Sequence, residues 1–71
     1  MQRKTHIIPR APVERLMIHA GAKRVSDEAV EELCDYLTEK GLEIAKKALA
    51  LSKHSGRKTV MEDDIKLAEK F

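Results

Sequence analysis

Apolar or small residues recur at steps of three and four through the middle of the chain. The longest such series consists of Val30, Leu33, Leu37, Gly41, Ile44, Ala48 and Leu51. This spacing predicts one long amphipathic helix over residues 27–54, with Ser26 as its N-cap. Asp27 and Glu28 fall in its first turn, where the helix dipole favours negative charge. No proline interrupts residues 27–58, so nothing in the sequence breaks this helix early.

Two shorter helices are predicted on either side of the long one. Pro12 predicts the start of the first, because a missing N–H costs nothing at the first helical position. Gly21 is expected to cap its C-terminus, and Gly56 to end the long helix. In "TVME", Thr59 and Glu62 have the spacing of a capping box, which predicts that the third helix starts at Thr59. The chain is therefore expected to be all-α, with helices in the order short, long, short.

The long helix offers more apolar surface than so small a chain can cover. The chain has 71 residues, and a domain of this size is usually marginal alone. A helix over residues 27–54 would be about 42 Å long at 1.5 Å per residue. Further apolar residues widen its stripe on both sides: Cys34, Tyr36, Leu42, Ala45 and Leu49. With a single cysteine the chain forms no internal disulfide, so the pattern predicts association with a second chain.

Charge is segregated along the chain, although the net charge is only +2. Basic residues dominate residues 1–24 and 46–58, whereas acidic residues dominate 27–43 and 62–69. Antiparallel pairing of the long helix would bring the basic "AKRVS" of one chain beside the basic "HSGRK" of the other. A nucleic-acid backbone would offset the resulting repulsion. The alternative, ordinary solvated helix faces, is the commoner explanation of a charge run taken by itself.

Several functional classes lack support in the sequence. It contains no CxxC pair and no His–Cys cluster, so neither a metal site nor another cofactor is expected. No glycine-rich phosphate loop and no acid–base constellation is present, so no catalytic residue is predicted and an enzyme is not expected. No apolar run approaches the roughly 20 residues of a membrane span. The start "MQRKTH" has no apolar run behind it, so it does not predict a signal peptide. An intracellular, soluble protein is expected.

Four segments together resemble the archaeal histones: "PRAP", "HAGAKRVSDEA", "KHSGRKTV" and "DDI". Their order and spacing are similar over residues 9–71. The resemblance implies a histone-fold domain at 9–71, preceded by a short basic arm at 1–8. It also implies an intertwined antiparallel dimer that wraps and compacts double-stranded DNA with little sequence preference. Dimers would assemble into larger histone–DNA particles in the cytoplasm, on the chromosome. Whether the chain pairs with itself or with a sister histone stays open.

The resemblance also implies which residues contact DNA. The matched residues are Arg15, Arg24, Lys58 and Thr59. Lys23 and Arg10 are also expected to contact DNA, although an apolar residue is common in the family at the position of Arg10. Arg15 would face the backbone, and Arg24 would enter the minor groove, whose negative potential attracts a guanidinium without any base code. Lys58 and Thr59 would hold phosphate, the lysine through its charge and the threonine through its hydroxyl.

Other positions match the family's assembly residues. The dimer–dimer contact would comprise Leu51, His54, Asp64 and Leu67. Arg57 matches an arginine that pairs with Asp64 and fastens the third helix, so its role is expected to be structural. Gly21 would let successive turns of a histone–DNA superhelix stack closely, or would simply cap its helix. The alternative function is a histone-fold transcription factor or dimerisation subunit, which would need a different partner chain.

Overall fold

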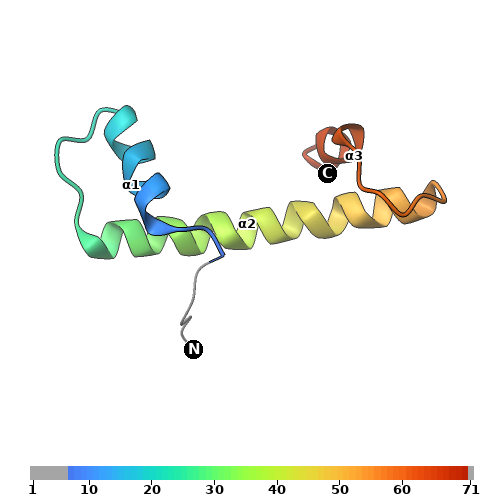
Figure 1. The fold of residues 1–71 in the computed structure, drawn as a ribbon, viewed down its shortest axis with the longest axis horizontal. Helices are drawn as coiled ribbons and strands as arrows, with labels where there is room; N and C mark the ends of the chain where they lie inside the picture. The colour runs from blue at the N-terminus through green and yellow to red at the C-terminus, as the bar shows by residue number, and fades with distance from the viewer. Residues whose placement is uncertain (1–6, 71) are drawn as a thin grey trace. The chain divides into compact units, whose positions relative to one another are not determined.

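The computed structural model describes residues 7–70 and contains three α-helices in that range (Figure 1). They are α1 (Arg10–His19), α2 (Asp27–His54) and α3 (Glu62–Ala68). No strand occurs in the described part of the chain, so the all-α, short–long–short prediction is confirmed. None of these helices is long and apolar enough to cross a membrane. Most of the proposed basic arm lies outside the described residues.

The long helix begins and ends where the sequence predicts. Ser26 caps it, because its Oγ accepts a hydrogen bond from the Ala29 N–H at 3.0 Å. Asp27 and Glu28 occupy the first turn, and Lys53 lies in the last turn, as the helix dipole favours at each end.

The first helix starts two residues earlier than predicted, at Arg10. Its N-cap is Pro9, whose extended backbone (φ −65°, ψ 154°) leads into the helix. Pro12 is therefore the third helical residue. It is tolerated there because the first few N–H groups of a helix have no intrahelical acceptor.

The third helix starts three residues later than predicted, so the capping role assigned to Thr59 is wrong. Met61 is the N-cap, and its N–H donates to Asp64 Oδ2 at 2.8 Å. The carboxylate half of a capping box is thus supplied by Asp64 rather than by Glu62. The other hydrogen bond of a capping box needs a side-chain oxygen on the N-cap residue to accept the N–H at the third helical position, and Met61 has no such oxygen.

Two segments connect the helices, the first linker (residues 20–26) and the second linker (residues 55–61). Each begins with the same hydrogen-bonded helix end. Gly21 has φ +116° and Gly56 has φ +76°. In both linkers the glycine N–H donates to the carbonyl of the residue three positions earlier. The N–H of the residue after the glycine donates to the carbonyl five positions before it, and all four distances are 2.9 to 3.1 Å. This is the Schellman motif, so the prediction that glycines end α1 and α2 is confirmed.

The chain divides into two compact units, residues 1–39 and 40–71, and each has a small core. In the first, Val13 of α1 packs with Val30 and Cys34 of α2. Four half-buried apolar residues surround them: Ile8, Val25, Leu33 and Leu37. In the second unit the buried side chains are Ala48, Ser52, Asp64 and Ala68.

Many large apolar side chains are left uncovered by these two cores. Nine of them are between 38% and 56% exposed: Leu16, Ile18, Tyr36, Leu42, Leu49, Val60, Met61, Ile65 and Leu67. Exposed apolar residues in such number mark surfaces that bind another molecule. A single chain therefore does not bury the apolar surface that its sequence carries.

Candidate nucleic-acid interface

The first linker presents two exposed cations. Lys23 and Arg24 are both exposed, and neither forms an ion pair with any residue between 7 and 70. The next residue, Val25, packs against the first core, and Ser26 caps α2. The backbone is thus held at the C-terminal end of this linker, while the charged side chains lie in solvent.

The two arginines of α1 differ in their surroundings. Arg15 is exposed and has no acidic partner within the described range. Arg10 lies 3.4 Å from Asp27, with side chains 46% and 92% exposed. An ion pair this exposed contributes little to stability, so it leaves Arg10 able to exchange its partner for a phosphate.

The second linker is fastened to α3 by a two-pronged ion pair. Arg57 Nη1 donates to Asp64 Oδ2 at 3.0 Å, and Nη2 donates to Oδ1 at 2.9 Å. The Asp64 side chain is only 7% exposed. The hydrogen bond from Arg57, followed by that from the Met61 N–H, lowers the pKa of Asp64 below its ordinary value. The same hydrogen bond raises the pKa of Arg57. The arginine is therefore engaged in holding the linker.

A buried serine on α2 holds the same linker from the other side. Ser52 Oγ lies 2.9 Å from the Thr59 carbonyl oxygen and 3.2 Å from that of Arg57, and the serine is 1% exposed. Arg57 Nη1 also donates to the Thr59 carbonyl at 2.9 Å. Sequence reasoning missed Ser52. The available signal was a polar residue four positions after Ala48, on the buried side of the helix.

Between these attachments the second linker exposes hydrogen-bond donors. Lys58 and Thr59 are both exposed, and Lys58 has no ion pair within residues 7–70. The backbone N–H groups of Lys58, Thr59 and Val60 donate to no acceptor in that range. One ammonium group and three N–H groups on a held backbone form an arrangement suited to a phosphate.

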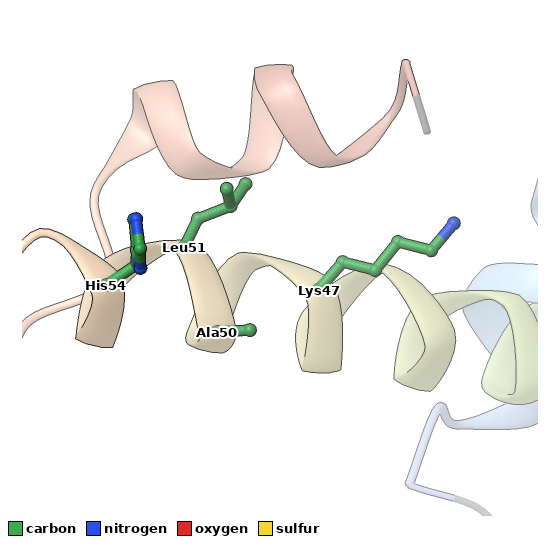
Figure 2. A pocket seen from close by; sticks show the side chains of 4 residues that line it. All are labelled: Lys47, Ala50, Leu51 and His54. Carbon is green, nitrogen blue, oxygen red and sulfur yellow. The ribbon is translucent and has the colours of Figure 1, made fainter.

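The residues expected at the dimer–dimer contact all belong to the second unit. Leu51 and His54 line a pocket of about 410 Å³ with Lys47 and Ala50, and Leu51 extends toward α3 (Figure 2). Leu67 is exposed, whereas Asp64 is buried and already engaged by Arg57. Both carboxylate oxygens of Asp64 are in use, although an ionised carboxylate has further acceptor capacity.

No described residues form a metal site. Across residues 7–70, no group of three or more His, Cys, Asp or Glu side chains could hold an ion. Cys34 is buried within the first core, as expected for a small apolar group.

The three-helix chain with cations on both linkers has the features of a histone-fold protein that binds DNA. Residues 6–68 match the model of the family "Histone-like transcription factor (CBF/NF-Y) and archaeal histone", and the chain belongs to this family. It is 48% identical over 63 residues to a subunit of the archaeal histone HAN1 of Thermococcus zilligii, covering 89% of this chain and 94% of the relative. It is 46% identical over 61 residues to probable archaeal histone 3 of Methanocaldococcus jannaschii, covering 86% and 91% respectively.

These matches confirm the resemblance to archaeal histones, and with it the histone fold. The chain is a DNA-binding architectural protein, and the alternative of a transcription-factor subunit is not favoured. Archaeal histones are associated with the chromosome, and so is this chain.

Proposed function

We propose that the chain packages double-stranded DNA as an antiparallel homodimer, and that these dimers assemble into larger histone–DNA particles in the cytoplasm. The observation that carries the proposal is the presence, on the linkers at the two ends of α2, of exposed cations with no ion pair among residues 7–70: Lys23, Arg24 and Lys58. Contacts from such residues to phosphates and to the minor groove give tight binding with little sequence preference. The role is packaging rather than catalysis.

The apolar stripe of α2 matches itself when the helix is paired with an antiparallel copy. The midpoint of Asp27–His54 falls between residues 40 and 41. About this point the stripe is symmetric, because Leu37 and Ile44 lie equally far from it, and Leu37 would face Ile44 of the second copy. The pairs Leu33/Ala48 and Val30/Leu51 follow the same spacing, but Val30 and Ala48 are already buried in the cores of their own chain, so the contact would centre on Leu37 and Ile44. A stripe with this symmetry gives the same contacts twice in a two-fold dimer.

Charge along α2 favours the same orientation. Residues 27–40 carry six carboxylates against Lys40, a net charge of −5, whereas residues 41–54 carry three lysines against Glu43, a net charge of +2. Antiparallel pairing sets each acidic half against a basic half, but parallel pairing sets like charges together. Because the complement of each half is on the same chain, the pattern supports a second copy rather than a different partner.

Gly41 supports a close crossing of the two helices at their midpoint. A glycine in the interior of a helix costs about 1 kcal/mol relative to alanine, so its position calls for a compensating use. Apart from the neighbouring backbone of the helix itself, nothing among residues 7–70 lies within 4 Å of where a Cβ would be. Without a side chain, this turn lets another backbone approach closely.

The crossing can be tested by cross-linking. In a Cys34→Ala background, Gly41→Cys should form an intermolecular disulfide, because two Cα atoms at the crossing would lie within the roughly 4.4–6.8 Å that a disulfide needs. Glu32→Cys is the matched control, since in this dimer its two copies would be about 25 Å apart along the helices. A dimeric protein that cross-links no better at 41 than at 32 would contradict the crossing but not the dimer.

This dimer would place the first linker of one copy beside the second linker of the other. Lys23 and Arg24 would then adjoin Lys58, and the free N–H groups of the second linker would lie close by. Arg24 is assigned to the minor groove, whereas Lys58 and Thr59 are assigned to phosphate. Two further exposed residues, Arg10 and Arg15, would extend the contact along α1.

Assembly of dimers would use the apolar surface at the end of α2. The pocket beside Leu51 and His54 would receive side chains of another dimer (Figure 2). The exposed Leu67 adds apolar area. His54 of one dimer would reach Asp64 of the next at the free lone pairs of its carboxylate. Gly21, which is exposed and has open space at its Cβ position, would allow successive turns of a superhelix to approach.

Sedimentation and thermal melting test the proposal as a whole. A chain with so much apolar surface uncovered should have no stable folded monomer, so its melting temperature should rise with protein concentration. Sedimentation should show dimers in free solution and larger particles on random-sequence duplex DNA. A monomer mass, with a melting temperature constant over a hundredfold range of concentration, would contradict the dimer.

A further inference from the structure

The second linker is held to α2 through the carbonyl groups on both sides of one residue. Ser52 Oγ lies within hydrogen-bonding distance of the carbonyls of Arg57 and Thr59, at 3.2 and 2.9 Å, and Lys58 stands between these two residues. A hydroxyl has a single proton, so it donates to one carbonyl at a time or shares the proton between both. Either way, the backbone around Lys58 is tied to one buried atom.

This tie is separate from the ion pair that holds the end of the linker. Arg57 and Asp64 fasten the linker to α3 through their side chains, and Asp64 also accepts the N–H of Met61. If the Ser52 hydroxyl were removed, the Thr59 carbonyl would keep its bond from Arg57 Nη1. The Arg57 carbonyl would have no other donor among residues 7–70. The segment freed by losing Ser52 is therefore the one around Lys58.

We infer that Ser52 is a positioning residue for DNA binding, whose hydroxyl holds the second linker in its phosphate-binding conformation before DNA arrives. This inference rests on the proposed phosphate contact of the second linker. Ser52 is buried, and the acceptors within reach of its hydroxyl among residues 7–70 are two carbonyls of the linker, so it carries no charge to the DNA and does not contact it. The hydroxyl contributes to affinity because the linker is already ordered in the free protein, so DNA binding does not carry the entropy cost of ordering it.

The inference predicts an unusual combination of effects for Ser52→Ala. All cations remain, so the dependence of affinity on salt should be unchanged. Affinity should nevertheless fall about tenfold, because ordering the backbone of roughly one residue on binding has a cost of that size. In the free protein, the backbone amides of Lys58 and Thr59 should become more mobile, with lower order parameters in nitrogen-15 relaxation.

The experiment compares three variants on one random-sequence duplex at several salt concentrations. Ser52→Ala should lose affinity at constant salt slope, and Lys58→Ala should lose both affinity and slope. Ser55→Ala is the matched control, because Ser55 is exposed in the same linker and its side chain makes no hydrogen bond within residues 7–70. It should bind as the unmodified protein does. Binding is measured well below the melting temperature of each variant, with dimer mass checked by sedimentation.

The outcomes separate the inference from the proposed function. Unchanged affinity of Ser52→Ala would overturn the inference, even if the variant melted at a lower temperature, because the serine would then be structural only. A reduced salt slope for Ser52→Ala would also overturn it, since a phosphate contact would have been lost. If Lys58→Ala kept full affinity and slope, the proposed phosphate contact itself would be contradicted, whatever Ser52 does.

Discussion

The two linkers start alike and are then held in different ways. Both follow a Schellman motif centred on a glycine, Gly21 or Gly56. Besides the Arg57–Asp64 ion pair, the second linker is then attached at three backbone groups: the carbonyls of Arg57 and Thr59 and the N–H of Met61. In the first linker, the attachments after the helix end are the half-buried Val25 and the capping Ser26. In the first linker, Lys23 and Arg24 thus come before the two residues that are held in place, Val25 and Ser26. In the second linker, Lys58 lies between Arg57 and Thr59, whose carbonyls are both hydrogen-bonded.

This difference agrees with the two kinds of DNA contact that the linkers are proposed to make. A phosphate contact depends on donors aimed at one place, which a held backbone provides. An arginine in the minor groove follows the width and potential of that groove, which vary with sequence. A side chain on a less constrained segment can follow that variation. We therefore expect perturbations of the second linker to be more costly than equivalent changes in the first.

The largest effect on stability should come from breaking the ion pair of the second linker. Asp64→Asn removes the charge that Arg57 binds in a buried position, so it should lower the melting temperature more than the loss of a helix-ending glycine or of an N-cap. Arg57→Ala should act in the same direction, because it leaves the Asp64 carboxylate without its partner. Asp63→Asn is the matched control, as Asp63 is the exposed neighbour of Asp64. Similar melting curves for Asp63→Asn and Asp64→Asn would contradict the role of the pair.

The same pair predicts a dependence on pH. The folded-state pKa of Asp64 is lowered by its hydrogen bond from Arg57, so the stability it contributes is complete above the ordinary aspartate pKa. That stability is lost as pH falls through the lowered pKa of the folded state. The gap in melting temperature between the unmodified protein and Asp64→Asn should therefore be wide at neutral pH and narrow in acid. A gap that stays constant through the acid range would contradict the assignment.

Alanine at the glycine of either helix end should have the next largest effect. Gly56→Ala should cost about 1–2 kcal/mol, because a residue with a Cβ is strained at positive φ. Gly21→Ala should cost at least as much, since φ +116° lies farther from the left-handed helical region. Within the described part of the chain no atom crowds either Cβ position, so the cost comes from the backbone alone. Gly56→Asn should recover part of the loss, and Gly21→Asn less; thermal melting at matched concentration checks this order.

A smaller loss is expected at the N-cap that ends the first linker. Ser26→Ala removes the acceptor for the Ala29 N–H and should cost about 1 kcal/mol, measured by denaturant unfolding at fixed protein concentration. Ser26→Asp should keep most of the stability, because aspartate caps equally well. An alanine variant as stable as the unmodified protein would show that this cap does not hold the linker.

The smallest effect should follow loss of the exposed pair between α1 and α2. Arg10→Ala breaks the contact with Asp27 and should change stability by about 0.5 kcal/mol or less. Its effect on DNA affinity should exceed its effect on folding if Arg10 contributes to the proposed interface. Equal affinity of Arg10→Ala and the unmodified protein at low salt would remove Arg10 from that interface.

The long helix was predictable because its signals are local and agree with one another. The stripe from Val30 to Leu51, the cap at Ser26 and the glycine at 56 all indicate the same boundaries. The starts of the short helices were not predictable in the same way. "TVME" has the letters of a capping box, but the Thr59 carbonyl accepts from Ser52 and Arg57, Met61 is the N-cap of α3, and Asp64 accepts the N–H of Met61. The bonds from Ser52 and to Asp64 join residues of different elements, and a local pattern cannot show which partner prevails.

The candidate site was only partly accessible from sequence. The cations Lys23, Arg24 and Lys58 could be identified by charge and by the family resemblance. The serine that holds the second linker could not, because its role depends on burial against two carbonyls that lie five and seven residues farther along the chain. A serine on the buried side of a helix indicates a buried hydroxyl, but the sequence pattern does not show which groups that hydroxyl contacts.

The measurement that tests the account most directly is the salt dependence of DNA binding. Arg24→Ala and Lys58→Ala each remove two charges from a dimer. Both should weaken binding to random and A·T-rich duplexes by similar factors, and each should reduce the slope of log affinity against log salt by about 0.9 per lost phosphate contact, up to roughly 1.8 per dimer. If both variants bind with unchanged affinity and slope, the linker cations are solvated charge and the proposed DNA interface is wrong.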